Sequence, residues 1–291
     1  MSNALQVLIL GLLLGGVYAL MAAGVTLAFG VMRIVNLAHA VMIVASAYIA
    51  YFAFENLGID PIVAVVIIMP TMFAIGLLTY VVLFTRIEGT ARYVEMTVLL
   101  TFAVAISIEG LLAYFFTGIF RNTSPAYGNE AFFLGDWYVP KGQLYASVLS
   151  VVLLLSLWAF LRFARTGYGI RATMQNRPAA QIVGVNVRRT SAIAFGISTG
   201  LAGASGALVS YIFPFFPARH WQWVALLLAL IVLGGMGSLK GAVVGALLLA
   251  VISSFVVDLA GPSWGPMTFY LALFLILLIR PQGLFGKEVM I

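Results

Sequence analysis

Three polar side chains lie close together inside an otherwise apolar run. The stretch VMRIVNLAHAVMIVASAYIAYF, residues 31–52, contains Arg33, Asn36 and His39. On a helix, Asn36 and His39 share a face, and Arg33 lies one turn before them. Polar groups buried in hydrocarbon are costly, so these three need either a structural partner or a function.

Two interpretations of this cluster stay open. In the first, Arg33 is a cytoplasmic anchor, Asn36 caps the following helix, and His39 bonds a neighbouring carbonyl. In the second, Asn36 and His39 line a translocation pathway, because polar residues within a membrane are functional candidates by default. We favour the pathway for Asn36 and His39, and the anchor for Arg33.

A second candidate segment is EMTVLLTFAVAISIEG, residues 95–110. Thr97 and Thr101 recur at helical spacing, and their small hydroxyl side chains predict either a narrow pathway or close helix packing. Glu109 lies deep enough in the segment to need a partner or a proton. We keep all three as pathway candidates, although a hydrogen-bonded structural role is the commoner one for each.

Composition indicates the setting of these residues. The chain is 63% hydrophobic and only 8% charged, against about 25% charged residues in a typical soluble domain. Its apolar runs are long and unbroken, whereas a transmembrane β-barrel shows short alternating segments. The sequence therefore predicts an all-α, polytopic transmembrane bundle that forms a single domain over residues 1–291. With no cysteine, neither a disulfide framework nor a thiolate metal site is possible.

Hydropathy predicts eight or nine spans of about 20 residues each. The nine candidates cover residues 4–30, 34–54, 61–85, 94–118, 143–163, 191–212, 223–239, 241–259 and 266–279. The connections on one side hold 12 of the 15 basic residues, and the positive-inside rule places that side in the cytoplasm. We therefore expect the N-terminus outside and the C-terminus inside. Topology explains the net charge of +6, so no nucleic-acid partner is needed.

Two connections are long. The outer one covers about 119–142 and is rich in aromatic residues that suit a membrane interface. The inner one, about 164–190, predicts two short helices: one over 170–176, and another over 179–183 that Gly184 ends before Asn186 caps the next helix. Apolar Ile182, Val183, Val185 and Val187 stand among arginines there. This pattern indicates either docking of a cytoplasmic partner or contact with anionic headgroups.

Glycines recur every four residues in two segments. Gly196 and Gly200 form one strip, and Gly237, Gly241 and Gly245 form another, each predicting close helix packing. Gly234, Gly235 and Ser238 form either a tight turn or a helix break. A break must face protein or water, which would make these three residues part of a pathway.

Several motifs together resemble one family of transport proteins. GGVYALMAAGVTLAFGVMRIVNLAHA (15–40), GYGIRATMQNRPAAQIVGVNV (167–187), LAGASGALVS (201–210), VLGGMGSLKGAVVGALLL (232–249) and RPQGLFGK (280–287) occur in order over nearly the whole chain. They resemble the permease subunits of branched-chain amino acid ABC importers. One departure is that Ala40 and Val41 stand where the family usually has glycine and an acidic residue. The resemblance therefore leaves urea, amides and aromatic or aliphatic acids open as substrates.

The resemblance implies a set of partners in a bacterial inner (plasma) membrane. They are a second homologous permease subunit, two cytoplasmic ATP-binding subunits that use ATP and Mg, and a periplasmic or extracellular solute-binding protein. It also implies that the inner connection couples to the ATPases. The candidate coupling residues are Gly169, Arg171, Ala172, Gln175, Asn176, Pro178, Ala179, Ala180, Val183 and Gly184.

Other functions are less favoured. No P-loop is present, since GLFGK (283–287) is too short and is followed by Glu288, so we expect no cofactor or catalytic residue in this chain. His39 and His220 fall on opposite sides of the predicted topology, so we expect no metal site. An ATP-independent secondary transporter or channel for urea or an amide remains the alternative, but such carriers commonly place carboxylates in their spans.

Overall fold

The computed structural model describes residues 4–135 and 137–286. Asp136, Lys287 and the two chain termini, whose sides of the membrane were predicted, lie outside the described residues. The helices are α1 (Ala4–Met32), α2 (Ala38–Leu57), α3 (Pro61–Thr79), α4 (Thr85–Ile87), α5 (Tyr93–Phe116), α6 (Lys141–Phe163), α7 (Arg165–Gln175), α8 (Arg177–Ile182), α9 (Val187–Ile212), α10 (His220–Gly234), α11 (Leu239–Ala260) and α12 (Gly265–Ile279). A π-helical turn, η1 (Tyr80–Phe84), follows α3, and single 3-10 turns are η2 (Ala126–Asn129), η3 (Pro217–Arg219) and η4 (Pro262–Trp264). Two short strands, β1 (Ala131–Leu134) and β2 (Trp137–Pro140), form an antiparallel hairpin.

The predicted helical bundle is confirmed. Within the described residues, nine helices are long and apolar enough to cross a membrane, and each overlaps one of the nine predicted segments. The seventh span covers 217–234 instead of 223–239, because the chain turns at Gly235. The ends differ for local reasons. The sixth span starts at Val187 instead of residue 191, because the Asn186 side chain accepts a hydrogen bond from the Arg189 amide at 3.0 Å and caps α9.

The second span starts later than predicted. Hydropathy placed its first residue at 34, but α2 begins at Ala38 and residues 33–37 are not helical. Hydropathy cannot detect this irregular segment, because Ile34, Val35 and Leu37 are as apolar as the helices on either side.

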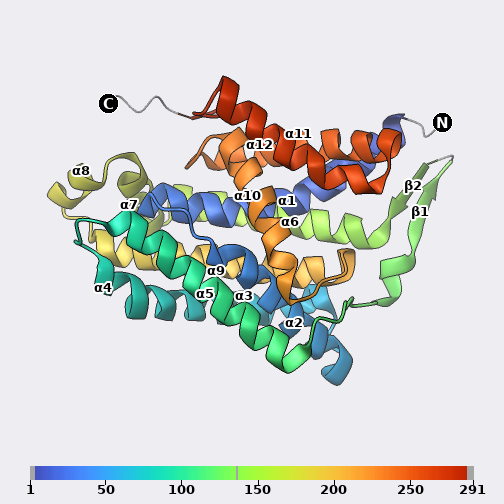
Figure 1. Ribbon diagram of the computed structural model, residues 1–291, viewed down its shortest axis with the longest axis horizontal. Coiled ribbons are helices and arrows are strands. Elements are labelled where there is room, and N and C mark those ends of the chain that lie inside the picture. The colour runs from blue at the N-terminus through green and yellow to red at the C-terminus, as the bar shows by residue number, and fades with distance from the viewer. Residues whose placement is uncertain (1–3, 136, 287–291) are drawn as a thin grey trace.

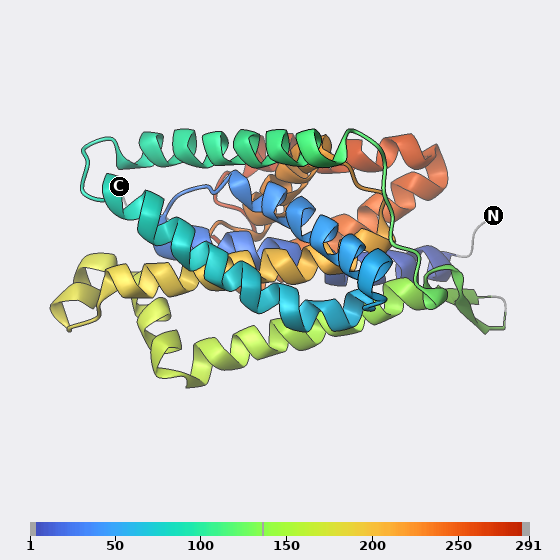
Figure 2. The ribbon, with the colours of Figure 1, turned by 90° about the horizontal axis from the view of Figure 1, so that it is seen from below.

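The bundle is built around α9, which is lined by small residues. A Cβ on Gly206 would lie 2.2 Å from the Ile43 carbonyl oxygen, so only glycine allows α2 to cross there. Gly203 meets Met72 of α3 in the same way. Figure 2 shows α9 in the middle of the molecule, with α5 along one edge and α6 along the other. Small side chains thus let this helix serve as the common packing partner of α1, α2 and α3.

The two ends of the bundle differ in character. Figure 1 shows α4, α7 and α8 at one end and the β1–β2 hairpin, with the start of α1, at the other. The basic inner connection forms α7 and α8, so the basic end and the hairpin end are opposite. Gln6 ties the hairpin to α1 by donating to the Tyr138 carbonyl at 2.8 Å and accepting from its amide at 3.0 Å.

The GGMGS segment is a tight turn between two helices. Gly235 and Gly237 have φ values of 95° and 85°, in the left-handed region that favours glycine. The Ser238 hydroxyl then accepts from the Gly241 amide at 3.1 Å and caps α11. Both flanking helices are long enough to cross a membrane, so the chain reverses here without a break inside either helix.

The absence of cysteine makes the predicted orientation directly testable. Phe133 in the hairpin is 79% exposed and Ile182 after α8 is 86% exposed. We expect Phe133→Cys to react with a membrane-impermeant maleimide in intact cells, and Ile182→Cys to react only in inside-out vesicles. The unsubstituted chain is the matched control, and the reverse labelling pattern would overturn the orientation.

Candidate functional site

The connection between α1 and α2 carries irregular backbone into the bundle. Ile34 and Asn36 are buried, and Arg33 has a φ of 59°. The connection reaches α5 at Thr101, eight residues beyond the start of that helix and so about 12 Å along it at 1.5 Å per residue. Figure 2 shows α2 starting well inside the end of the bundle marked by the α4–α5 connection. Non-helical backbone at such depth is tolerated only against protein or a water-filled space.

Side chains satisfy the buried start of α2. The Leu37 amide donates to the Thr101 hydroxyl at 3.3 Å, and the Ala38 amide donates to Asn36 Oδ1 at 3.1 Å. The Asn36 carbonyl accepts from the His39 amide at 3.3 Å. The N-cap position of α2 is Leu37, so Asn36 precedes the cap but still satisfies the first amide of the helix, and Thr101 satisfies the Leu37 amide from α5.

His39 lies one turn further in and is 2% exposed. Its Nδ1 is 3.4 Å from the Ser198 hydroxyl on α9. Nε2 is buried and has no hydrogen-bond partner among the described residues. On the α1 side the ring lies against Gly24, where a Cβ would come within 2.6 Å of the ring carbon Cε1. The imidazole of His39 on α2 is thus packed between α9, where it contacts the Ser198 hydroxyl, and α1, where it contacts Gly24.

Asn36, His39, Thr101 and Ser198 together form a buried line of uncharged polar groups, here called the polar seam. Ala38, Val41 and Ala105 pack together beside it, so the face between α2 and α5 is apolar at that point. Val41 is the position where the resemblance leads one to expect an acidic residue. The seam supplies uncharged hydrogen-bonding groups, and the side chains packed beside it are small and apolar.

Thr97 continues the buried face of α5 toward the basic end. It is fully buried, but its hydroxyl donates to the Tyr93 carbonyl of its own helix at 2.6 Å. At the hairpin end, aromatic rings close the same α2–α5 contact. Tyr48 stacks on Phe116 at 4.9 Å between centroids and meets Phe215 edge-on at 5.0 Å.

Glu109 belongs to a separate cluster nearer the hairpin end. Trp221 Nε1 donates to its carboxylate at 3.1 Å, and His220 Nε2 lies 3.8 Å from the same oxygen. The buried His220 has Nδ1 3.1 Å from the Pro217 carbonyl, which can only accept, so Nδ1 carries the proton. The predicted need of Glu109 for a partner is met by α10, and His220 is a residue that the sequence pattern did not connect to it.

The glycine turn lies apart from the seam. Gly234 packs directly on Gly241, and its carbonyl accepts from the Phe285 amide at 3.2 Å. Gly235 is held by residues 283–286, and Ser238 caps α11. The turn abuts the end of α1, where a Cβ on Gly237 would lie 3.5 Å from Gly30.

The predicted packing glycines lie on helix contacts. Gly196 and Gly200 face Phe73 and Met69 of α3. Gly241 and Gly245 face α10, while Gly237 belongs to the turn.

The inner connection contains the two predicted short helices. Asn176 Oδ1 accepts from the Ala179 amide at 3.0 Å and caps α8, and Pro178 occupies its first turn. Gly184, with a φ of 85°, lies just after its end. The exposed members of the predicted coupling set are Arg171, Gln175, Asn176, Pro178, Ala179, Val183 and Gly184; Gly169 and Ala172 are half-buried and Ala180 is buried. Val187, expected among the exposed apolar residues, is instead 3% exposed because it starts α9.

Two side-chain contacts join this connection to the helices of the seam. Arg33 donates from Nη2 to the Met174 carbonyl of α7 at 2.9 Å. Arg177 of α8 forms a 2.5 Å ion pair with Glu88, which precedes α5. Arg33 was expected only to anchor a turn, and nothing local in the sequence pairs it with residue 174. Ser198 was missed in the same way, although its position in GISTG, between two packing glycines, marks a hydroxyl on a crowded helix face.

Gly24 tests the arrangement of the seam. We expect Gly24→Ala to push His39 away from Ser198 and to lower the free energy of unfolding by about 1–3 kcal/mol, as overpacking does. Gly110→Ala is the matched control, because a Cβ there meets nothing within 4 Å. Thermal unfolding of the two variants is the measurement. Equal effects of the two substitutions would contradict the packing described for His39.

A family of known proteins and several individual relatives match most of the chain. The family described as "Branched-chain amino acid transport system / permease component" matches residues 7–279. The chain is 26% identical to the high-affinity branched-chain amino acid transport system permease protein BraD of Pseudomonas aeruginosa, over 97% of this chain and 96% of that protein. It is 24% identical to the corresponding permease LivH of Escherichia coli, over the same shares. A solved structure of PsaBC from Streptococcus pneumoniae in complex with Fab is 17% identical, covers 96% of this chain and 92% of its own, and aligns with a TM-score of 0.47.

Proposed function

The chain belongs to the family of branched-chain amino acid transport permeases, and from this premise we propose that it is the membrane permease of an ATP-driven importer. Its substrates are branched-chain amino acids or related small amphipathic solutes. The observation that carries the proposal is the family match over nearly the whole chain. The chain is a multi-pass membrane protein, and its family supports a bacterial inner membrane as the proposed location.

The proposal assigns energy supply to partner subunits. Two cytoplasmic ATPases bind ATP and Mg and dock on the inner connection, where Ile182 and Val183 are 86% and 76% exposed beside arginines. A second homologous permease completes the membrane unit, and a solute-binding protein delivers substrate at the hairpin end. Exposed apolar side chains with a basic rim support protein docking over headgroup contact alone, because headgroups favour the charges but give little to isoleucine and valine.

The polar seam is the proposed contact for the substrate inside the membrane. Asn36, His39 and Thr101 supply uncharged hydrogen-bonding groups, and Ala38, Val41 and Ala105 supply an apolar wall. The aromatic contacts of Tyr48 with Phe116 and Phe215 lie between the seam and the hairpin end, so they must separate to admit a solute from that side. Thr97 extends the proposed pathway toward the cytoplasm. Gly234, Gly235 and Ser238 are left out of it, because they form a turn without a helix break, apart from the seam.

Movement of the inner connection has two routes to the seam. The Arg33–Met174 hydrogen bond joins α7 to the segment that starts α2, and the Arg177–Glu88 pair joins α8 to the segment that starts α5. Of the seam residues, His39 lies on α2, Thr101 on α5 and Asn36 directly before α2, while Ser198 lies on α9. A shift of α7 and α8 on ATPase closure is therefore applied to both the α2 side and the α5 side of the seam, which is what alternating access requires.

An ATP-independent carrier or channel has less support. The family and both relatives named above are described as transport-system permeases. Glu109, the carboxylate such a carrier would use, already accepts a hydrogen bond from Trp221. The inner connection, with its contacts to the segments that precede α2 and α5, would also lack a role.

Copurification followed by reconstitution tests the proposed function. We expect the tagged chain to bring with it one or two P-loop ATPases and a second permease, and the reconstituted complex to accumulate leucine only with ATP and the binding protein. Uptake by this chain alone, without ATP, would overturn the proposal.

The Arg177–Glu88 pair gives a sharper test of coupling. Arg177→Glu should lower uptake per ATP hydrolysed, and the added change Glu88→Arg should restore much of it. The pair is partly exposed and so contributes only about 0–1 kcal/mol to stability, which predicts nearly unchanged thermal unfolding. Arg165→Glu, an exposed charge reversal on α7 outside this pair, is the control. No rescue in the double variant would contradict coupling through this contact.

A further inference from the structure

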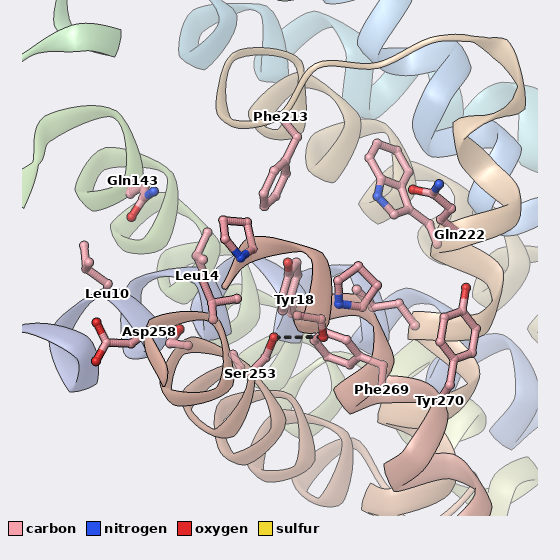
Figure 3. A pocket seen from close by; sticks show the side chains of 18 of the residues that line it. Leu10, Leu14, Tyr18, Gln143, Phe213, Gln222, Ser253, Asp258, Phe269 and Tyr270 are labelled. Carbon is pink, nitrogen blue, oxygen red and sulfur yellow. Dashed lines mark hydrogen bonds between the residues drawn. The ribbon is translucent and has the colours of Figure 1, made fainter. Parts of the chain in front are cut away.

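A cavity of about 380 Å³ lies at the hairpin end, away from the polar seam. It is lined by α1, α10, α11 and α12 with the start of α6 and the end of α9, and Figure 3 shows it from close by. These are the helix ends on the side opposite α7 and α8. Its volume falls at the small end of the range for ligand sites, about 300–1,000 Å³.

One wall of the cavity is aromatic. Tyr18 stacks with Phe213 at 6.3 Å between centroids and meets Phe269 edge-on at 5.8 Å. Figure 3 shows the three side chains converging, with Leu14 beside them. Such a surface accepts an aliphatic chain of any branching, because it offers area without directional contacts.

The polar lining is sparse and incompletely satisfied. Arg219, at the start of α10, is the one basic residue among the described lining residues. Its Nε atom is fully buried and has no hydrogen-bond partner, and neither has the buried Oε1 of Gln143. A guanidinium prefers a planar, bidentate anion such as a carboxylate, and leaving its buried N–H unpaired is costly.

We propose that this cavity binds a small amphipathic carboxylate, with its carboxylate on Arg219 and its apolar chain on Tyr18, Phe213 and Phe269. The interpretation of that ligand as a transported solute rests on the proposed function. The site then holds solute at the hairpin end, before it reaches the uncharged seam.

Photo-crosslinking locates the site directly. The assembled complex in phosphatidylcholine nanodiscs is treated with a diazirine analogue of leucine, and adducts are mapped by mass spectrometry. We expect adducts on the cavity segments of α1, α10 or α12, and competition by 4-methylpentanoate but not by 3-methylbutylamine, which lacks the carboxylate. Adducts confined to α2 and α5, or competition by the amine alone, would overturn the proposal.

Substitution of Arg219 supplies the matched comparison. Arg219→Gln should reduce cavity labelling at least tenfold, and Arg219→Lys, which keeps the charge but loses the bidentate geometry, should reduce it less. Arg162→Gln makes the same change on an exposed arginine at the other end of the bundle and should leave labelling unchanged. Thermal unfolding identifies any variant that fails to fold, in which case Gln143→Leu takes its place with an expected partial loss. Labelling that persists in the folded Arg219 variants overturns the site.

Two further arms separate the possible outcomes. Discs containing 30% phosphatidylglycerol test whether a lipid phosphate holds Arg219 instead. Loss of labelling in those discs would make the headgroup the occupant and overturn the carboxylate proposal. ATP-driven leucine uptake without cavity labelling would leave the proposed function standing while this inference fails. Cavity labelling without ATP-driven uptake would leave the carboxylate site standing while the proposed function fails.

Discussion

The structure depends on one constraint: backbone amides inside a membrane must find partners within the protein. The constraint is met most conspicuously at residues 33–37, where the chain is not helical although it has entered the bundle. Asn36 Oδ1 accepts a hydrogen bond from the Ala38 amide, and the Thr101 hydroxyl accepts one from the Leu37 amide. As a result, α2 can start inside the bundle without unsatisfied backbone donors. In the function proposed above, the same two side chains contact the passing solute. The same residues therefore satisfy the backbone and form the polar seam. Asn36 can have a structural role and a transport role at once.

Close packing around α9 follows from this irregular start. A helix that begins inside the bundle must be fixed laterally, and glycines allow the approach: Gly24 admits the His39 ring, and Gly206 admits the backbone of α2. Ser198 then meets His39 from α9. Since interiors this dense resist gradual deformation, a change at the seam is expected to involve whole helices. The contacts from Arg33 to Met174 and from Arg177 to Glu88 are placed to move such helices as units.

Sequence patterns predicted the elements well and their neighbours poorly. Hydropathy found all nine spans because each is a local property of about 20 residues. Pro178 and Gly184 marked the first turn and the end of α8 because turn signals are local as well, whereas Asn176, predicted to lie in the preceding helix, caps α8 instead. The predicted start of the second span, residue 34, was wrong by four residues, because α2 begins at Ala38 and nothing local distinguishes an apolar loop from an apolar helix. Pairs such as Glu109 with Trp221, 112 residues apart, depend on which faces meet across the bundle. The periodicity of a single sequence does not contain that information, and for the same reason it did not predict the cavity at Arg219.

The distribution of charge along the proposed route has a physical logic. A group that binds a solute tightly in the middle of a membrane also holds it there, so conduction requires contacts that are favourable but weak. The seam meets this requirement with an amide, an imidazole and two hydroxyls, and Val41 keeps its wall apolar. Charged side chains stand instead at the ends, with Arg219 and Asp258 in the cavity near the hairpin and the arginines of α7 and α8 at the opposite end. Selectivity for a carboxylate is then exerted where a solute enters, and release is not slowed by an ion pair inside the bundle. The absence of the family's acidic residue beside His39 fits the same division, because an acid at that depth would strengthen the one contact that needs to be brief.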